Sequence, residues 1–432
     1  MSTPLAQRSN AELEKLQQEL DAAYQGLSAA QGGNQLKLDL SRGKPGAEQL
    51  DLSNGLEEAL GGDFFSADGT DTRNYGGIRG ISEARELGAE LMSVPGNEII
   101  AGGNSSLTMM HLVLRTAMDL GLWGDERRWS NCPTAKILTP VPGYDRHFAL
   151  AEHFGLEMVN VPMNDDGPDM QAAHELVAND DSIKGIWCVP KYANPTGCTY
   201  SDSVVDAIAA LPKHAKADDF VVMWDNAYAV HHLNEHGEHL KSIRDAALSQ
   251  DTQEHIVQFA STSKITHAGS GIAFIAGADK VLANLEKHMA VFTIGPDKVN
   301  QLRHARFLKG RLREHMAAHA AIIRPKFDLV LKSFEQELGS LGIATWTKPK
   351  GGYFVSLDLQ PGLAKEVVAM AKAVGLTLTP AGATFPGDHD PEDRNMRIAP
   401  TFGSLDEINA AMDILTLCIK LASVRKLVSD KT

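Results

Sequence analysis

The chain has 432 residues, of which 43% are hydrophobic, and its formal net charge is −14. This length is ample for a large core and suggests two domains, while the acidic balance argues against nucleic-acid binding. No apolar run approaches the length of roughly 20 residues that spans a bilayer, and the first residues lack the basic segment and apolar core of a signal peptide. We therefore expect a cytoplasmic protein that binds neither nucleic acid nor membrane.

The first predicted element is a polar helix at residues 11–30. From Glu98 to about Pro296, short apolar runs then alternate with helical stretches, which is typical of a mainly parallel sheet with crossover helices. The runs that predict buried strands are residues 135–139, 157–161, 184–189, 220–224, 256–259 and 272–276.

The chain after Asp297 has a different pattern. It begins with a long helical stretch to Leu338, which we expect to be interrupted at Pro325. The elements predicted beyond it are strands at 344–346 and 353–357, a helix near 362–374 and a last helix from Ser404. This pattern predicts a smaller α+β region.

A glycine-rich turn at residues 102–106 (Gly-Gly-Asn-Ser-Ser) precedes the helical residues 107–118. Such a turn offers free backbone N–H groups and the positive end of a helix dipole to a phosphate. The alternative is an ordinary N-cap by Asn104 or Ser105.

Polar residues follow three of the predicted strands. Asn194 follows the run at 184–189, Asp225 and Tyr228 follow the run at 220–224, and Lys264 follows the run at 256–259. Ligands bind at the carboxyl ends of parallel strands. There a lysine can form a Schiff base with an aldehyde cofactor, an aspartate can keep a pyridine nitrogen protonated, and tyrosine or asparagine can hydrogen-bond a phenolic oxygen. These residues predict a pyridoxal 5'-phosphate site.

The order Asn-Pro-x-Gly, Asp-x-Ala-Tyr and Ser-x-Ser-Lys, ending at Lys264, resembles fold-type I pyridoxal-phosphate enzymes, especially class I aminotransferases. The resemblance covers roughly Leu38 to Leu417. Residues 224–233, together with 261–266, are similar to a divergent bacterial aspartate aminotransferase group close to MocR-like proteins.

The resemblance implies an α/β fold with a large domain, built on a mainly parallel sheet, and a smaller α+β domain. Residues 1–70 would contribute to the small domain, residues 71–310 would form the large cofactor-binding domain, and residues 311–432 would form the small C-terminal domain.

The resemblance also implies roles for the matched residues. Lys264 would carry the cofactor as a Schiff base and move protons, Asp225 would contact the pyridine nitrogen, and Tyr228 would contact the phenolic oxygen. The other residues implied to bind the cofactor are Asn104, Ser105, Ser106, Tyr144, Asn194, Ser261 and Tyr75. For Tyr144, which would stack on the ring, the alternative is a half-buried loop tyrosine.

Three positions are implied to bind substrate: Arg397 would take the α-carboxylate, Gly43 would lie over the substrate, and Asn194 would assist. Arg394 is the rival of Arg397, and we interpret it as a surface charge. Tyr75 would reach the partner subunit's phosphate, which implies a homodimer with shared active sites.

One position departs from the family pattern, because Ile272 stands where the family has an arginine that pairs with the phosphate. His267 is near in sequence, but a turn histidine is an equal interpretation. The pair His231 and His232 suggests a metal site, yet without further ligands at metal spacing we expect none and favour packing near the pocket.

The function that these residues predict is transamination, with L-aspartate and 2-oxoglutarate as the expected substrates. The alternatives are an aminotransferase for alanine or an aromatic amino acid, and a pyridoxal-phosphate-dependent lyase. A cofactor-sensing regulator would need a basic winged-helix domain before Ser41, and the residues there carry no basic cluster. The base that binds a distal carboxylate is not identified; Lys350 is a candidate, although a solvated turn lysine is the simpler interpretation.

Overall fold

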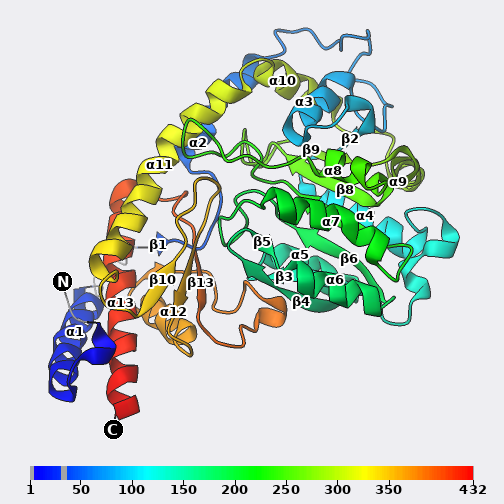
Figure 1. Ribbon diagram of the computed structural model, residues 1–432. Helices are drawn as coiled ribbons and strands as arrows, with labels where there is room; N and C mark the ends of the chain where they lie inside the picture. Colours follow the sequence, from blue (N-terminus) through cyan, green and yellow to red (C-terminus); the bar gives the residue numbers. More distant parts are fainter. Residues whose placement is uncertain (1–3, 31–36, 432) are drawn as a thin grey trace.

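The computed structural model describes residues 4–30 and 37–431 (Figure 1). Its α-helices are α1 Asn10–Ala30, α2 Ala47–Asp51, α3 Ser82–Met92, α4 Ser106–Asp119, α5 Asp145–His153, α6 Met170–Asn179, α7 Asp202–His214, α8 Ile243–Ser249, α9 Asp279–Phe292, α10 Lys298–Leu308, α11 Leu312–Glu337, α12 Ala364–Ala373 and α13 Leu405–Lys431. Its strands are β1 Leu38–Asp39, β2 Ile99–Ala101, β3 Lys136–Val141, β4 Glu157–Asn164, β5 Gly167–Pro168, β6 Ile183–Cys188, β7 Val221–Asp225, β8 Ile256–Ser261, β9 Ala273–Ala276, β10 Ala344–Trp346, β11 Val355–Leu359, β12 Leu376–Thr377 and β13 Asn395–Ile398.

A large sheet with strand order β2-β9-β8-β7-β6-β3-β4-β5 organises residues 99–276. The five central strands from β8 to β4 pair in parallel, whereas β2, β9 and β5 pair antiparallel. The predicted α/β fold with a mainly parallel sheet is therefore confirmed. The sequence alternates helices with strands here because each parallel pair needs a crossover connection.

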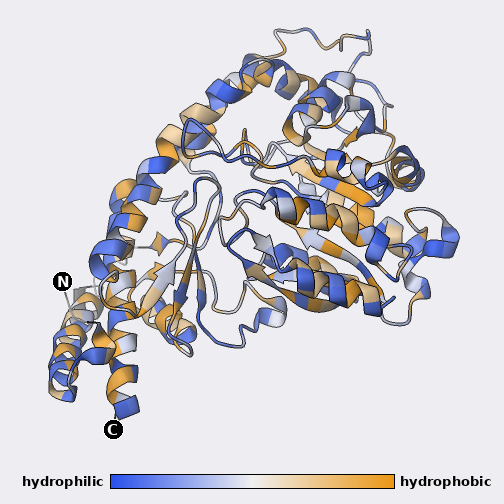
Figure 2. Cartoon of the chain, viewed as in Figure 1, coloured by the Kyte–Doolittle hydropathy of each residue, from blue (hydrophilic) through white to orange (hydrophobic). Residues whose placement is uncertain are grey.

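Helices cover both faces of this sheet, as expected for strands made mostly of apolar residues. In β7, Val221 and Met223 join a buried cluster with helices α4 and α9, while Val222 and Trp224 join a second cluster with α6, α7 and α8. Successive side chains of a strand point to opposite faces, so a strand that is buried on both sides is apolar throughout. Figure 2 shows the hydrophobic residues concentrated in the sheet, with hydrophilic residues on the outer helices.

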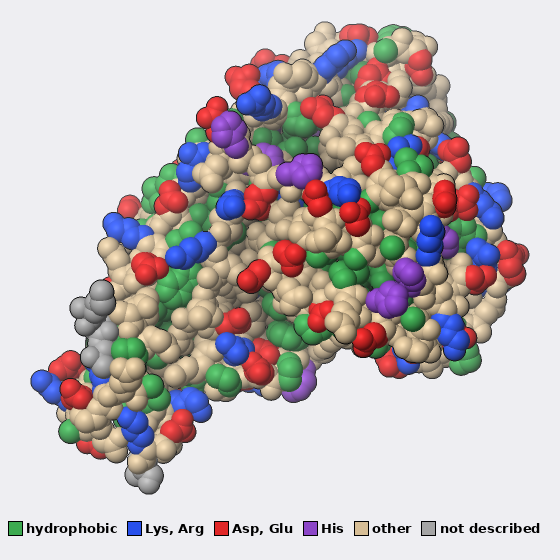
Figure 3. All heavy atoms as spheres, in the orientation of Figure 1, with side chains coloured by type: hydrophobic (Ala, Val, Ile, Leu, Met, Phe, Trp, Pro, Cys, Tyr) green, Lys and Arg blue, Asp and Glu red, His purple; other side chains and the backbone are tan. Residues whose placement is uncertain are grey.

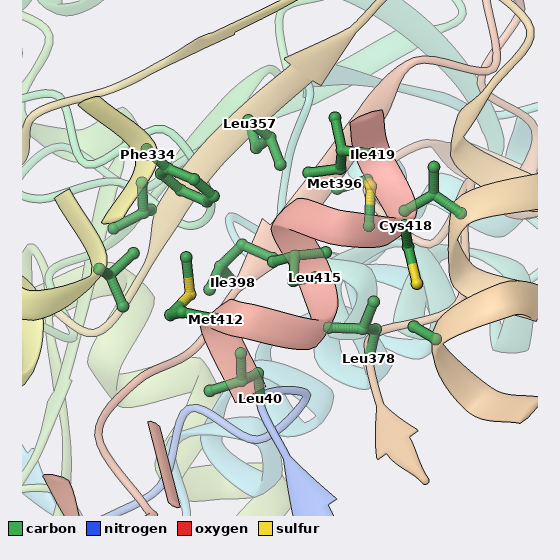
Figure 4. Packing of buried hydrophobic residues seen from close by; sticks show 14 of the residues in the cluster. Leu40, Phe334, Leu357, Leu378, Met396, Ile398, Met412, Leu415, Cys418 and Ile419 are labelled. Atoms are coloured by element: carbon green, nitrogen blue, oxygen red, sulfur yellow. The ribbon is translucent and has the colours of Figure 1, made fainter. Parts of the chain in front are cut away.

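The smaller region combines the two ends of the chain. Strand β1 pairs in parallel with β12, with Leu38 opposite Leu376, and α1 packs along α13. A three-stranded sheet, β10-β11-β13, lies beside them. Figure 4 shows Leu40 from the N-terminal segment beside the α13 residues Met412 and Leu415, within the same buried cluster. This packing agrees with an N-terminal contribution to the small domain, whose boundaries at residues 70 and 310 stay predictions.

The expected helix break at Pro325 is wrong. Pro325 lies inside α11, and the break falls earlier, where Gly310 takes a left-handed φ of 69° between α10 and α11. A proline inside a helix costs about 3 kcal/mol or more, but Ile323 and Phe327 beside it are buried in the core and hold the helix together. Helix α11 thus continues past Pro325 and links the two regions (Figure 1).

The surface is mixed in charge. On the face in Figure 3, acidic and basic side chains lie interspersed among polar and apolar ones. Within residues 4–30 and 37–431, no helix has the length and apolar character needed to cross a membrane.

Candidate active site

Four loops that carry predicted site residues meet at one edge of the large sheet. Strands β8, β7, β6 and β3 are neighbours in that order, and parallel strands end at the same edge. The loops after these strands hold Lys264, Tyr228, Asn194 and Tyr144, respectively. The structure therefore brings together residues that lie up to 120 positions apart, between 144 and 264.

Lys264 lies in the turn that connects β8 to the antiparallel β9. Its Nζ is 5.1 Å from the ring centre of the buried Tyr228. Burial lowers the pKa of Lys264 below its usual value, and the nearby Asp225 carboxylate partly opposes this shift. A lowered pKa leaves more of the amine neutral, which is the form that attacks an aldehyde.

Asp225 ends β7 and is buried with one oxygen left free. Its Oδ2 accepts a hydrogen bond from His147 Nε2 at 3.0 Å, while Oδ1 has no partner among the described residues. His147 is itself fixed by stacking on Trp187, with ring centres 4.2 Å apart. A buried carboxylate oxygen without a donor is costly, and the N–H of a pyridinium ring would satisfy it. This arrangement fits a pyridoxal cofactor.

His147 is a site residue that the sequence interpretation missed. It lies on α5, one helical turn after Tyr144, so both side chains project to the same side of the helix start. Their rings are 5.0 Å apart in an edge-to-face arrangement. The three-residue spacing between Tyr144 and a histidine was the available signal.

The glycine-rich turn before α4 has the features of an anion site. Ser105 is the N-cap residue, but its side chain makes no capping hydrogen bond. Asn104 Nδ2 instead donates to Gly269 O at 2.9 Å, and Ser263 Oγ donates to Asn104 O at 3.1 Å. Ser105 thus occupies the N-cap position that the alternative gave it, but its side chain does not cap the helix. The N–H groups at this helix start and the Ser105 hydroxyl remain available to a phosphate.

The remaining hydroxyls lie beside this turn. Ser106 begins α4, and Ser261 ends β8, where its Oγ accepts from Ser263 N at 3.4 Å. A Cβ built on Gly103 would meet no atom within 4 Å, so the turn borders open space. The geometry can hold a phosphate through hydroxyls, backbone N–H groups and the helix dipole.

Ile272 does not contribute to this candidate phosphate site. Its side chain is buried in an apolar cluster with Ile265, Phe274 and Leu302, and its N–H donates to Thr262 Oγ1 at 2.9 Å. A cationic side chain in this environment would bury an unpaired charge. The structure thus gives a packing reason for isoleucine where the family has arginine.

Arg397 on β13 presents one edge of its guanidinium to the pocket. Nη1 donates to Asp145 Oδ1 at 2.7 Å and to Asn194 Oδ1 at 3.3 Å, while Nε is buried without a partner among the described residues. The unpaired edge suits the two-pronged binding of a carboxylate. Its rival Arg394 instead pairs with Glu392 at 2.9 Å.

Gly43 lies against the same part of the pocket. A Cβ at this position would collide with the ring of Phe354, whose face lies 5.0 Å from the Arg397 guanidinium. Close approach, rather than an unusual φ, therefore requires glycine here.

Other basic residues near the expected entrance are already engaged. The Lys350 side chain is 66% exposed and pairs with Glu238 at 3.1 Å, and Arg42 lies 3.5 Å from Asp39. The interpretation of Lys350 as a surface lysine is thus favoured. His232 Nδ1 bonds the Tyr192 hydroxyl at 2.8 Å, and no cluster of metal-ligating side chains occurs in the part of the chain that the structure describes.

Tyr75 lies away from this pocket. Its side chain is 83% exposed, and its loop is held by the buried Lys298, whose Nζ donates to Asn74 O at 2.6 Å and Gly76 O at 2.7 Å. The sequence interpretation missed Lys298. The role of Tyr75 at a partner's site stays a prediction.

Comparison with known proteins shows which family and which relatives the chain resembles. It matches the family model described as aspartate amino-transferase over residues 8–431, a wider match than the motifs indicated. A Mycolicibacterium smegmatis protein with the provisional name of aminotransferase is 50% identical over 403 residues, covering 92% of this chain and 94% of the relative. An aspartate aminotransferase of Corynebacterium glutamicum is 44% identical over 391 residues, covering 90% of both chains. The crystal structure of a Corynebacterium glutamicum aspartate transaminase superposes with a TM-score of 0.94 and 41% identity, over 99% of this chain and 100% of that one.

These matches agree with the architecture and with the site. The fold is that of fold-type I pyridoxal-phosphate enzymes, and the family's cofactor is pyridoxal 5'-phosphate. The names of these relatives do not all specify a substrate: the Mycolicibacterium smegmatis protein is named only as an aminotransferase. The chain therefore belongs to the aspartate amino-transferase family.

Proposed function

We propose that the protein transfers the amino group of L-aspartate to 2-oxoglutarate, with its cofactor bound through Lys264. The observation that carries the proposal is a group of three side chains: Lys264, whose pKa is lowered by burial, and the buried Asp225 and Arg397, whose Oδ1 and Nε have no partner among the described residues. The aspartate aminotransferase of Corynebacterium glutamicum, at 44% identity, supports the choice of substrate.

Each side chain has a separate role in the proposed reaction. Bound pyridoxal phosphate supplies an electron sink for the negative charge that develops at the substrate's α-carbon. Lys264 Nζ takes the proton from that carbon. Asp225, oriented by His147, keeps positive charge on the pyridine nitrogen, and Tyr228 with Asn194 orients the reacting groups. Tyr144 would lie on one face of the ring.

The substrate's α-carboxylate would bind the Nε edge of Arg397, while Asp145 and Asn194 hold the guanidinium from the other side. Phosphate binding would fall to the residues at the start of α4 and to Ser261. Asn104, Ser105 and Ser106 belong to that turn. We also propose a cytoplasmic location, which is consistent with the four free cysteines.

Substrate preference provides the direct test. Catalytic efficiency, kcat/KM, should be at least about tenfold higher for L-aspartate than for L-alanine or an aromatic amino acid, which corresponds to about 1.4 kcal/mol. Arg397→Lys should reduce kcat/KM for all these donors by a similar factor, because lysine lacks the two-pronged geometry. Arg394→Lys, which changes the surface arginine paired with Glu392, is the matched control.

A preference for alanine or an aromatic amino acid would contradict the aspartate assignment. The aminotransferase family would remain, because it rests on the match over residues 8–431.

We also propose a homodimer that shares its active sites. Exposed apolar side chains lie near Tyr75, namely Val291, Phe292 and Ile294. A hollow of about 510 Å³, lined by Tyr75, Gly76 and residues 290–296, lies between the two segments. Large exposed apolar groups of this kind are typical of protein interfaces, and a second copy of the chain would cover them.

Hybrid dimers test the role of Tyr75. Tyr75→Phe alone should weaken cofactor retention, because it removes a hydroxyl that would reach the partner's phosphate. Mixing an inactive Lys264→Ala chain with Tyr75→Phe should produce hybrids whose intact lysine site faces an intact Tyr75. These hybrids should retain cofactor at that site as well as the wild type does. Retention no better than in Tyr75→Phe homodimers would contradict sharing.

A further inference from the structure

The backbone carbonyl of Lys264 is held from outside its own turn. His231 Nε2 lies 3.2 Å from this oxygen, and the Tyr353 hydroxyl donates to it at 3.4 Å. Within the turn, the N–H groups of Ile265 and Thr266 both donate to Thr262 O. The partners of the Lys264 carbonyl therefore come from the loop after β7 and from the turn before β11.

The direction of each hydrogen bond follows from chemistry. A carbonyl oxygen can only accept, so His231 must carry its proton on Nε2. His231 Nδ1 is then an acceptor, and it is buried without a partner among the described residues. Burial, together with the charge of Lys264, lowers the pKa of His231 to about 3. His231 is thus neutral and held in one tautomer.

Tyr353 is oriented by a residue of the N-terminal segment. The N–H of Gly46 donates to Gln49 Oε1 at 3.2 Å, which fixes the orientation of the Gln49 side-chain amide. Gln49 Nε2 then donates to the Tyr353 oxygen at 3.0 Å and to His319 Nδ1 at 3.1 Å. Because Tyr353 accepts from Gln49, its own proton is free for the Lys264 carbonyl.

The next peptide group is anchored in the same way. His315 on α11 donates to the carbonyl of Ile265 at 2.7 Å. The side chains of Gln49, His231 and Tyr353 are all buried. Unsatisfied polar groups in such a place would be costly, so these contacts fix a single arrangement of the turn.

We propose that His231 and Tyr353 are positioning residues that hold the peptide group of Lys264, with Gln49 orienting Tyr353. The inference rests on the proposed role of Lys264 and assigns a function to a histidine that the sequence left unexplained. It also connects the loop at Gly43–Gly46, which lies over the expected substrate position, to the lysine through Gln49. A lysine amine is placed by its backbone, and a shift of about 1 Å at a reacting group costs on the order of 10²-fold in rate.

The test uses three variants of the full-length enzyme loaded with pyridoxal phosphate. His231→Leu removes the donor, His231→Gln retains a donor at the position of Nε2, and His232→Leu changes the neighbouring histidine, which bonds Tyr192 instead. We expect kcat to fall roughly 10- to 100-fold in His231→Leu, with KM for the amino donor changed less than about twofold. His231→Gln should recover most of the loss, and His232→Leu should resemble the wild type.

The second readout is amide hydrogen exchange, which does not depend on activity. Exchange at Ile265 and Thr266 should rise by about tenfold or more in His231→Leu, because the turn loses an anchor, and should stay unchanged in His231→Gln and His232→Leu. If His231→Leu does not fold, Tyr353→Phe removes one hydroxyl and keeps the ring, and the same change in exchange is expected.

Three results would overturn the proposal: wild-type kcat in His231→Leu, unchanged exchange in that variant, or a His231→Gln enzyme as impaired as His231→Leu. The last result would show that the imidazole only fills space. Failure of the proposed role of Lys264 is distinguishable, since borohydride reduction would then fix the cofactor to a different lysine, and failure of the aspartate assignment would appear in the donor preference, whatever the exchange data show.

Discussion

Replacing Lys264 by alanine should reduce the rate of transamination by roughly 10³-fold or more, while the chain still folds and binds its cofactor. The variant loses the amine that bonds the cofactor and the base that moves the proton. Phosphate and ring contacts from the start of α4, Ser261 and Asp225 are unchanged, so binding should weaken but persist. Steady-state kinetics and cofactor titration measure the two effects separately.

Lys264→Arg is the matched control. It keeps the positive charge and much of the length, but a guanidinium does not lose its proton at accessible pH and cannot attack an aldehyde. It should therefore be as inactive as Lys264→Ala, whereas restored activity would show that charge alone matters. In the wild type, borohydride reduction followed by peptide mapping should find the cofactor on Lys264. An adduct on another lysine would refute the assignment.

The sequence placed Lys264, Asp225 and Asn194 at the ends of predicted strands, and the structure has them at or after the ends of β8, β7 and β6, for a physical reason. Strands β7 and β8 are buried on both faces, so both are largely apolar, with Gln258 as a buried polar residue in β8, and the polar residues that come next mark the carboxyl ends of the strands. In a parallel sheet these ends lie at one edge. Local pattern therefore implied spatial convergence without any knowledge of the packing.

The residues that the sequence did not reveal depend on contacts between distant segments. His147 is an ordinary residue of an amphipathic helix until the sheet order places β3 two strands from β7 and brings His147 to Asp225. Lys298 and Gln49 are polar residues in helices, and only the folded chain buries them. Periodicity and composition carry no signal for such contacts.

Two local signals also had to yield to tertiary packing. Pro325 predicts a break in a helix, but buried neighbours on either side keep α11 continuous. At the position of Ile272 the family pattern has an arginine that pairs with the phosphate, whereas in this chain the isoleucine lies in an apolar cluster. In both cases the burial of apolar surface decides the outcome, at about 25 cal/mol for each Å² removed from water.

Replacing Asp225 by asparagine should lower kcat by about 10²-fold, because a charge-assisted hydrogen bond of roughly 1.5–3 kcal/mol to the pyridine nitrogen is lost. The amide keeps the shape of the side chain, so the fold should survive. A cofactor analogue that is methylated on the pyridine nitrogen carries its positive charge permanently and should restore part of the rate. Turnover equal to the wild type would contradict the proposed role of Asp225 in the electron sink.

The neighbouring histidine provides a graded control for the same pair. His147→Gln keeps an N–H donor toward Asp225 Oδ2 and should retain most activity, whereas His147→Leu leaves the buried carboxylate without that donor. His147→Leu should therefore approach the loss seen in Asp225→Asn. Equal activity in the glutamine and leucine variants would show that the contact does not matter for orientation.

The melting temperature, measured with and without cofactor, should distinguish the contact of Asp225 with the cofactor from its contribution to the fold. Without cofactor, Asp225 Oδ1 is buried and has no partner among the described residues, so a neutral asparagine should leave the melting temperature unchanged or raise it. With cofactor bound, the wild type gains the charge-assisted contact and the variant does not. The rise in melting temperature on adding pyridoxal phosphate should thus be smaller in Asp225→Asn, in line with cofactor affinity weakened about 10- to 10²-fold. An equal rise in both proteins, measured by differential scanning calorimetry at matched cofactor concentration, would place the pyridine nitrogen elsewhere in the pocket.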